Sequence, residues 1–235
     1  YPWLDQKGLK VGQRFGYIAL GLFESQEEIA NSALQAGDVR PGDIKFKDLN
    51  GDGLINAYDH AAIGYGQVPE IIYGFGFTVG YRSLSLSTLF QGVGNMDIWL
   101  NGEGLVPFQQ GLSRGNLFNN ITDRWTEANP NPNAFYPRLS AGTINDNFAR
   151  STWWIQNGRY LRLKSMQLTY KLPKAFVSKA KLQNAEIFFS GFNLLTISPF
   201  KLWDAELGDG ADSAYPGGAG YPNVATYSVG LNVNF

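Results

Sequence analysis

The chain has 235 residues with 19 basic and 20 acidic side chains, and its net charge of −1 argues against a nucleic-acid-binding protein, which would be basic. It has no cysteine, which excludes a disulfide framework, a thiolate metal site and a cysteine nucleophile. The sequence contains no run of eighteen apolar residues, so no transmembrane helix is predicted. The strands of a membrane β-barrel, about ten residues of alternating hydrophobicity, would not produce such a run. The first residues have neither the basic start nor the apolar stretch of a signal peptide. Either an export signal was removed or the chain is a piece of a longer protein, and we favour the piece.

The first part of the chain predicts one strand and one helix. Residues 12–21 contain aromatic and aliphatic side chains interrupted by glycine at positions 12, 16 and 21, which makes the stretch a candidate strand. Ser25 stands three residues before Glu28, the spacing of a capping box, and predicts a helix through about Gln35.

Residues 43–59 contain the most specific local motif of the sequence. Within a loop of twelve residues, oxygen-bearing side chains fall at positions 1, 3, 5, 9 and 12 with glycine at position 6, the spacing of a calcium loop. Position 12 is an aspartate instead of the usual glutamate and no helix precedes the loop, which favours a single dockerin-like loop. The alternative is an Asn-Gly and Asp-Gly turn without a metal. The predicted Ca²⁺ ligands are Asp48, Asn50, Asp52, the Leu54 carbonyl, Asn56 and Asp59.

Further along the chain, period-two alternation predicts strands. Residues 71–94 form a hairpin around Arg82–Ser83, with one face aromatic and aliphatic and the other composed mostly of Gly, Ser and Thr. In residues 159–172 the apolar phase slips by one residue near Ser165, which predicts a β-bulge. Residues 174–181 are interpreted as a solvated turn, and residues 185–195 as a strand that is apolar on both phases. Residues 95–158 form a long, irregular stretch.

The last twelve residues show the strictest alternation in the chain. Thr226, Ser228, Gly230, Asn232 and Asn234 are polar or small, and the residues between them are all apolar. A final strand that ends on Phe is typical of the terminal strand of an outer-membrane β-barrel. We therefore interpret as an assembly signal the apolar residues Tyr227, Val229, Leu231, Val233 and Phe235.

Loop lengths extend this interpretation. If Phe235 lies on the periplasmic side, the predicted short turns fall on that side, and the calcium-type loop, residues 95–158 and residues 196–223 all fall outside. Short periplasmic turns and long extracellular loops are the asymmetry of outer-membrane barrels. The predicted fold class is therefore all-β, a transmembrane antiparallel β-barrel with long extracellular loops. Six predicted strands are too few to close such a barrel.

The sequence resembles the C-terminal part of SusC/RagA-like TonB-dependent outer-membrane transporters over residues 1–235. The motifs that carry the resemblance run in order through the chain: Val11–Tyr17, Gly42–Gly53, Tyr73–Phe75, Phe90–Gly92, Arg124–Thr126, Tyr136–Leu139, Gly158–Lys164, Ser190–Leu195 and the terminal strand.

This resemblance implies a 22-stranded barrel in the outer membrane of a Gram-negative bacterium, filled by a plug domain that this chain lacks. It implies import of oligosaccharides or peptides, energy supplied through the TonB complex, a SusD-like surface lipoprotein as partner, and outer-membrane lipid around the barrel. Tryptophans on or near the outer loops are candidates for stacking on sugars, although packing between loops or a position at the lipid interface explains each of them more simply: Trp99, Trp125, Trp153, Trp154 and Trp203.

Two other functions are weighed against transport. A secreted, calcium-stabilised β-sandwich that binds carbohydrate would explain the 48–59 loop and the tryptophans, but not the terminal Phe or the one-sided loop lengths. An enzyme is disfavoured, because the single His60 lies beside the predicted calcium loop and no nucleophile motif or pair of acids is found.

Overall fold

The computed structural model describes residues 1–66, 68–102, 105–107, 119–140, 146–209 and 220–235. These residues form strands, loops and short helices, and the predicted all-β class is confirmed. The chain divides into two compact units, each assembled from three separate segments. Unit 1 comprises Tyr1–Val68, Met96–Asn157 and Leu207–Gly220, and unit 2 comprises Pro69–Asn95, Gly158–Glu206 and Tyr221–Phe235.

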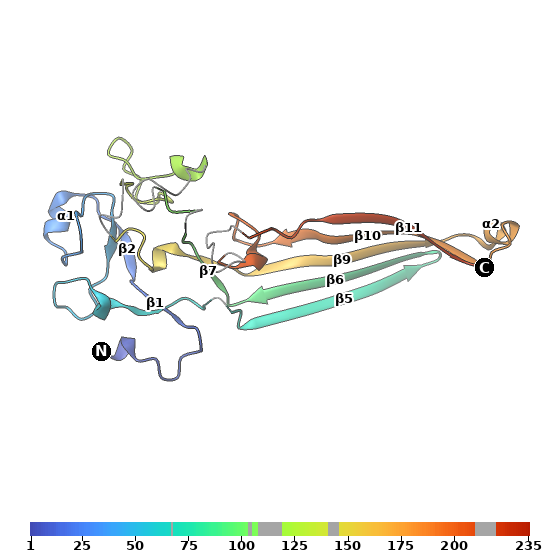
Figure 1. Ribbon diagram of the computed structural model, residues 1–235, viewed down its shortest axis with the longest axis horizontal. Helices are drawn as coiled ribbons and strands as arrows, with labels where there is room; N and C mark the ends of the chain where they lie inside the picture. Colours follow the sequence, from blue (N-terminus) through green and yellow to red (C-terminus); the bar gives the residue numbers. More distant parts are fainter. Residues whose placement is uncertain (67, 103–104, 108–118, 141–145, 210–219) are drawn as a thin grey trace. The chain divides into compact units, whose positions relative to one another are not determined.

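Unit 2 is a five-stranded antiparallel sheet with the strand order β11, β10, β9, β6, β5 (Figure 1). The strands are nine to fourteen residues long, which is enough to cross a bilayer, since a tilted membrane strand needs about 9–11 residues. Five of the predicted strands are thereby confirmed. Their bounds are β5 Ile71–Tyr81, β6 Leu84–Gly94, β9 Tyr160–Lys171, β10 Asn184–Ile197 and β11 Thr226–Asn234.

Both short connections of the sheet lie at the end where the chain also terminates (Figure 1). Arg82 and Ser83 join β5 to β6, with Arg82 in the left-handed region at φ 55°. The connection from β9 to β10 contains the helix α2 (Lys174–Lys179), which follows Pro173 and buries Val177. The segment predicted as a solvated turn is exposed except at Val177, but it forms a short helix instead of a turn, because proline favours the start of a helix and an apolar side chain is available to anchor it.

The predicted β-bulge is confirmed. Against β6, Ser165 pairs with Leu89 and Leu163 pairs with Phe90, so Lys164 is the extra residue of β9. The register with β10 shifts at the same place. The bulge brings the apolar residues on either side of it onto one face of the sheet, which explains the slip in the sequence pattern.

Unit 1 consists of short elements paired into three two-stranded sheets: β1 with β4, β2 with β3, and β7 with β8. The strands are β1 Arg14–Gly16, β2 Ala19–Leu22, β3 Ile44–Phe46, β4 Ala61–Ile63, β7 Asp97–Trp99 and β8 Ile155–Asn157, and the α-helix is α1 Gln26–Ala30. The described 3₁₀ helices of the chain are η1 Pro2–Leu4, η2 Ala57–Asp59, η3 Asn119–Thr122, η4 Thr152–Trp154 and η5 Ala205–Leu207.

Two elements of unit 1 differ from the predictions. The strand expected over residues 12–21 is interrupted at Tyr17, which donates to the Arg150 carbonyl (2.9 Å) and accepts from the Thr152 N–H (3.0 Å). The helix expected through Gln35 ends at Ala30, because the buried Gln35 side chain instead bonds the Ile44 carbonyl and the Phe46 N–H of β3. The cap was predicted correctly, since the Ser25 side chain accepts from the Glu28 N–H.

Asp43 is a buried carboxylate of unit 1. It is 1 % exposed and accepts hydrogen bonds from Arg138 Nε and Nη2 (3.0 and 2.9 Å), Asn147 Nδ2 (2.8 Å) and the Arg40 N–H (2.8 Å). Arg138 and Asn147 belong to residues 95–158, which the sequence predicts to be irregular. Most of that region is in fact part of unit 1, and its Tyr136 and Trp154 are among the most deeply buried side chains.

Candidate functional site

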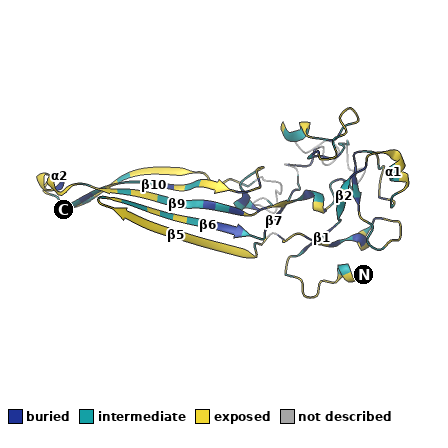
Figure 2. Cartoon of the chain, turned by 180° about the vertical axis from the view of Figure 1, so that it is seen from behind, coloured by how far each residue is buried: buried dark blue, intermediate teal, exposed yellow. Residues whose placement is uncertain are grey.

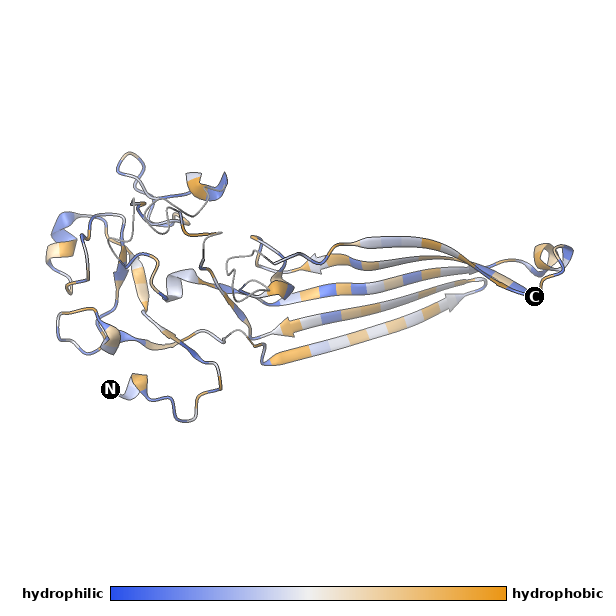
Figure 3. Ribbon diagram, in the orientation of Figure 1, coloured by the Kyte–Doolittle hydropathy of each residue, from blue (hydrophilic) through white to orange (hydrophobic). Residues whose placement is uncertain are grey.

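One face of the five-stranded sheet is apolar across its whole width. Between the bulge and the end of the sheet that carries the short connections, the strand pairings align side chains from five strands into continuous rows on this face. Two such rows are Val229–Phe189–Leu168–Leu86–Val79 and Leu231–Ile187–Tyr170–Leu84–Tyr81. Many of these side chains are exposed, most of all in the outer strands β5 and β11 (Figure 2), and in Figure 3 hydrophobic and hydrophilic residues alternate along the strands.

The opposite face carries small and polar side chains. A row from the same strands reads Ser228–Ser190–Gln167–Ser87–Thr78, and Thr78 and Ser87 are hydrogen-bonded at 2.9 Å. The strand 185–195, apolar on both phases in the sequence, places Phe188 on this polar face. Its ring lies over Gly230 of β11, where a Cβ atom would come within 2.2 Å of the ring. Gly230 therefore leaves room for the Phe188 ring on a face where the alternation predicts small or polar side chains.

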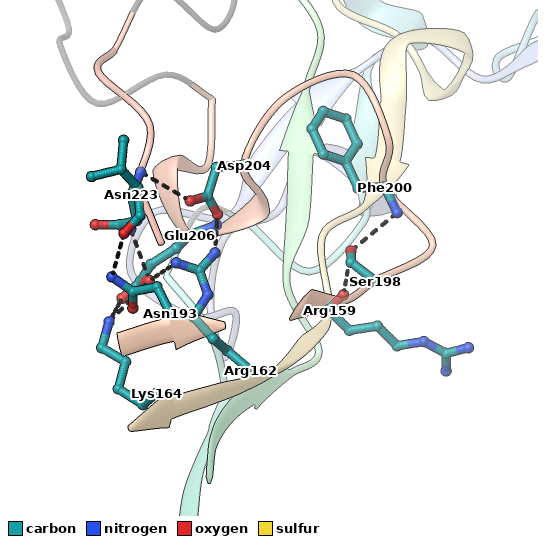
Figure 4. Close-up of polar contacts among 10 residues, drawn as sticks. Arg159, Arg162, Lys164, Asn193, Ser198, Phe200, Asp204, Glu206 and Asn223 are labelled. Atoms are coloured by element: carbon teal, nitrogen blue, oxygen red, sulfur yellow. Dashed lines mark hydrogen bonds and ion pairs between the residues drawn. The ribbon is translucent and has the colours of Figure 1, made fainter. Parts of the chain in front are cut away.

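A charged cluster lies on the polar face, between β9 and the loop that follows β10 (Figure 4). Arg162 is 2 % exposed; its guanidinium bonds Asp204, and its Nη1 lies 2.9 Å from Glu206 Oε2. Lys164 Nζ donates to both Glu206 oxygens (3.0 and 3.2 Å). Asn223 contributes its N–H to Asp204 and its side-chain amide to Glu206. Two cations thus meet two carboxylates.

The charges of this cluster stabilise each other. Burial alone would raise the pKa of Asp204, but the hydrogen bond and charge of Arg162, together with the N–H groups of Glu206 and Asn223, lower it below its ordinary value. Asp204 is therefore the anionic partner that a buried guanidinium requires.

A cavity of about 310 Å³ adjoins the cluster. Phe200 and Trp203 provide two rings in a T-shaped contact with centroids 4.8 Å apart. The lining residues come from β9, β10 and the loop after β10: Arg162, Thr196, Ser198, Phe200, Lys201, Trp203, Asp204, Ala205 and Asn223.

In the predicted calcium loop of unit 1, the oxygen-bearing side chains accept bonds from the loop's own backbone. Asp48 accepts hydrogen bonds from the Gly53 and Gly51 N–H groups. These bonds lower the pKa of Asp48, and the bond from Gly53 has the larger effect. Asp59 is fully buried and accepts from the Leu49 and Asn56 N–H groups. Among the described residues, no three acidic or histidine side chains gather as a metal-binding group. The loop geometry therefore depends on backbone bonds, and the cation stays a prediction.

The tryptophans proposed to stack on sugars are in different environments. Trp125 is 6 % exposed, and its ring lies on Gly42, where a Cβ atom would come within 2.2 Å of it. It packs inside unit 1 and is not an available platform, so that candidate is corrected. Trp99 is half-buried with the Arg150 guanidinium 4.2 Å from its ring centroid. Trp203 is half-buried and lines a cavity.

Four of the predicted assembly residues lie on β11, which pairs with β10 along one side, and Phe235 follows the last residue of that strand. Their exposed fractions include 64 % for Tyr227, 76 % for Val229 and 87 % for Phe235. Tyr227, Val229, Leu231 and Val233 share the apolar face of the sheet with their β10 partners. The strand is thus an apolar edge of the described sheet, and its role as a signal stays a prediction.

The charged cluster is not predicted by the sequence. Arg162 and Lys164 lie in the Gly158–Lys164 motif, and their partners lie 42 residues further along the chain. One signal for the cluster is present in the sequence. Arg162 and Lys164 are two residues apart in a predicted strand and hence on one face, where the neighbouring side chains are uncharged.

None of the described helices is long and apolar enough to span a membrane. A scan against protein-family models found no match. Among curated proteins the chain is similar to two receptors of Formosa agariphila. It is 33 % identical over 230 residues to TonB-dependent receptor P26, covering 94 % of this chain and 22 % of the receptor. It is 28 % identical over 239 residues to TonB-dependent receptor P3, covering 98 % and 23 %.

Solved structures share the fold. The chain superposes on the RagAB peptide importer in its closed-closed state with a TM-score of 0.66 at 21 % identity, and in its open-open state with 0.64 at 20 % identity. Both matches cover 95 % of this chain and less than a quarter of the importer chain. The chain thus spans about a fifth of the length of the relatives that it matches.

Proposed function

We propose that this chain, which is homologous to TonB-dependent receptors and has the fold of a part of the RagAB importer chain, forms part of the wall of an outer-membrane nutrient importer. The observation that carries the proposal is the sheet of unit 2. Its strands have the length of membrane strands, one face is apolar over five strands, and the other face is polar. An apolar face of this extent is far larger than a water-soluble surface normally exposes, and lipid would cover it.

The two outer strands of the sheet support the same conclusion. Among the described residues, β5 pairs only with β6 and β11 pairs only with β10. Long, apolar, unpaired strands are liable to aggregate, and closure into a barrel removes them. We infer that further strands, outside this chain, continue the wall on both sides.

The proposal extends to the partners of the whole protein. By kinship we assign import of oligosaccharides or peptides, driven through the TonB complex, with a SusD-like surface lipoprotein as partner, in the outer membrane of a Gram-negative bacterium. The relatives are by name receptors and an importer, which supports transport and not catalysis. Co-purification of a tagged full-length protein with a surface lipoprotein would test the partner.

The experiment that tests the wall uses neighbouring residues on opposite faces of β9. In the full-length protein, Leu168→Arg places a charge on the apolar face and should strongly reduce the amount of folded protein in outer membranes, since such a charge costs about 2–4 kcal/mol at the bilayer midplane. Gln167→Arg, on the polar face, is the control and should assemble normally. If the wild-type protein is soluble without detergent, the β-sandwich alternative is correct and the wall is wrong.

We also propose that residues 48–59 bind Ca²⁺. The spacing of the oxygen donors supports this, with the ligands Asp48, Asn50, Asp52, the Leu54 carbonyl, Asn56 and Asp59. The positive φ angles of Gly51 (73°) and Gly53 (79°) provide the tight turn that such a loop needs. A chelator should lower the thermal stability of the wild-type protein, and Asp52→Ala should abolish that effect. Equal melting temperatures with and without the chelator would exclude the site.

A further inference from the structure

The cavity beside the charged cluster combines features of a ligand site. Its residues come from two strands and the loop that follows them, and its volume of about 310 Å³ lies at the lower end of the range for small-molecule sites. Ser198 orders one wall, because its hydroxyl donates to the Arg159 carbonyl (2.8 Å) and accepts from the Phe200 N–H (3.1 Å) (Figure 4). That part of the cavity is therefore fixed before any ligand enters.

One lining residue of the cavity has a buried donor without a partner among the described residues. Arg162 is 98 % buried, yet its Nε–H makes no hydrogen bond to any described residue. Buried polar groups are almost always satisfied, and an exception implies a water or a ligand at that place. Arg162 therefore offers a hydrogen bond that this part of the chain does not use.

The charge balance narrows the class of ligand. Arg162 and Lys164 are opposed by Asp204 and Glu206, so the cluster has no net charge with which to select a free anion or cation. Lys201 adds a charge to the lining, but it is exposed and water screens it. A neutral ligand with both donors and acceptors fits this balance best.

The aromatic residues of the cavity further restrict the class of ligand. Phe200 is buried and fixes the half-buried Trp203 through the T-shaped contact, so the indole is a rigid wall of the cavity. Thr196 and Asn223 add a hydroxyl and an amide. A sugar ring has an apolar C–H face and a rim of hydroxyl groups, and therefore matches a ring wall surrounded by polar groups. An apolar peptide side chain would leave those groups unpaired.

We propose that this cavity is a subsite for one ring of a neutral oligosaccharide. This inference rests on the proposed import function and assigns its substrate class. The C–H face of the sugar packs on Trp203, and its hydroxyl groups exchange hydrogen bonds with the polar lining.

The test uses the full-length transporter in detergent and isothermal titration with maltohexaose, cellohexaose, xylohexaose, laminarihexaose and a mixture of hexapeptides. Trp203→Ala should weaken binding of the oligosaccharide that binds the wild type on the order of tenfold, because it removes the ring wall. Trp203→Phe should restore part of the loss. Thr196→Val, which keeps the shape and removes one hydroxyl, should weaken binding about fivefold. Trp3→Ala, which changes a tryptophan of unit 1, is the control and should leave the affinity unchanged.

Two results would overturn the inference and leave the import function intact. One is binding of peptides but of no oligosaccharide. The other is oligosaccharide binding that both Trp203→Ala and Thr196→Val leave unchanged, with each variant folded in outer membranes. Failure of the wild-type protein to enter the outer membrane would instead refute the import function.

Discussion

Asp43 offers the sharpest test of how unit 1 is held together. Asp43→Asn preserves the size of the side chain but removes its charge, while Arg138, 16 % exposed, keeps its own. The amide can also no longer accept at both oxygens, so part of the set of four hydrogen bonds is lost. Breaking a buried pair by removal of one partner costs about 3–5 kcal/mol, and we expect about 3 because Arg138 retains some contact with water.

The matched control is Asp38→Asn. Asp38 also pairs with an arginine, Arg40, but both side chains are more than half exposed, and such surface pairs contribute little to stability. Pulse proteolysis of the full-length protein in detergent measures the open population of unit 1, and a loss of 3 kcal/mol raises that population on the order of a hundredfold. If the two variants are cleaved equally, Asp43 does not stabilise unit 1 in the way described.

Three further predictions concern single positions. Gly42→Ala should destabilise unit 1 by about 2–4 kcal/mol in the same proteolysis assay, because the added Cβ atom clashes with Trp125 and the φ angle is positive. Gly51 also has a positive φ angle but has open space around it, so Gly51→Ala should cost only about 1–2 kcal/mol. Burial lowers the pKa of His60, so the unfolded state binds a proton at a higher pH than the folded state does. The stability of the fold should therefore decrease as the pH drops below the ordinary histidine pKa of about 6.5. Thermal melts of His60→Gln should show a weaker pH dependence than those of the wild type. Deletion of Phe235 should reduce the amount of folded protein in outer membranes far more than transport per assembled barrel, and unchanged assembly would exclude its role as a signal.

The strands of unit 2 could be predicted from the sequence because their signals are local. Alternation with a period of two shows which residues share a face, and a slip in that alternation, as near Ser165, shows a bulge. The two-residue turn at Arg82–Ser83 fixes the register of its hairpin. The pairing of β6 with β9 joins residues as far apart as Val93 and Tyr160, and the alternation does not specify it.

Unit 1 and the charged cluster could not be predicted in this way, because they depend on distant contacts between polar residues. Asp43 meets Arg138 across 95 positions, and Arg162 meets Asp204 across 42. No periodicity records such a pair, and a charged residue in a sequence looks the same whether it is solvated or buried. The helix expected through Gln35 shows the same limit, because a bond to β3, nine residues away, ended it.

The bulge at Lys164 explains how the predicted apolar face of the sheet and the unpredicted charged cluster both fit in strand β9. On one side of it, Leu161 and Leu163 face the apolar surface, and on the other side Met166 and Leu168 do so, although their spacing is odd. Without the extra residue, either Arg162 or the apolar run beyond Ser165 would lie on the wrong face. An arginine on the apolar face would lose Asp204 and Glu206 and meet lipid instead, at a cost of a few kcal/mol. The one-residue insertion therefore allows a continuous apolar surface and a buried, paired guanidinium to coexist in a single strand.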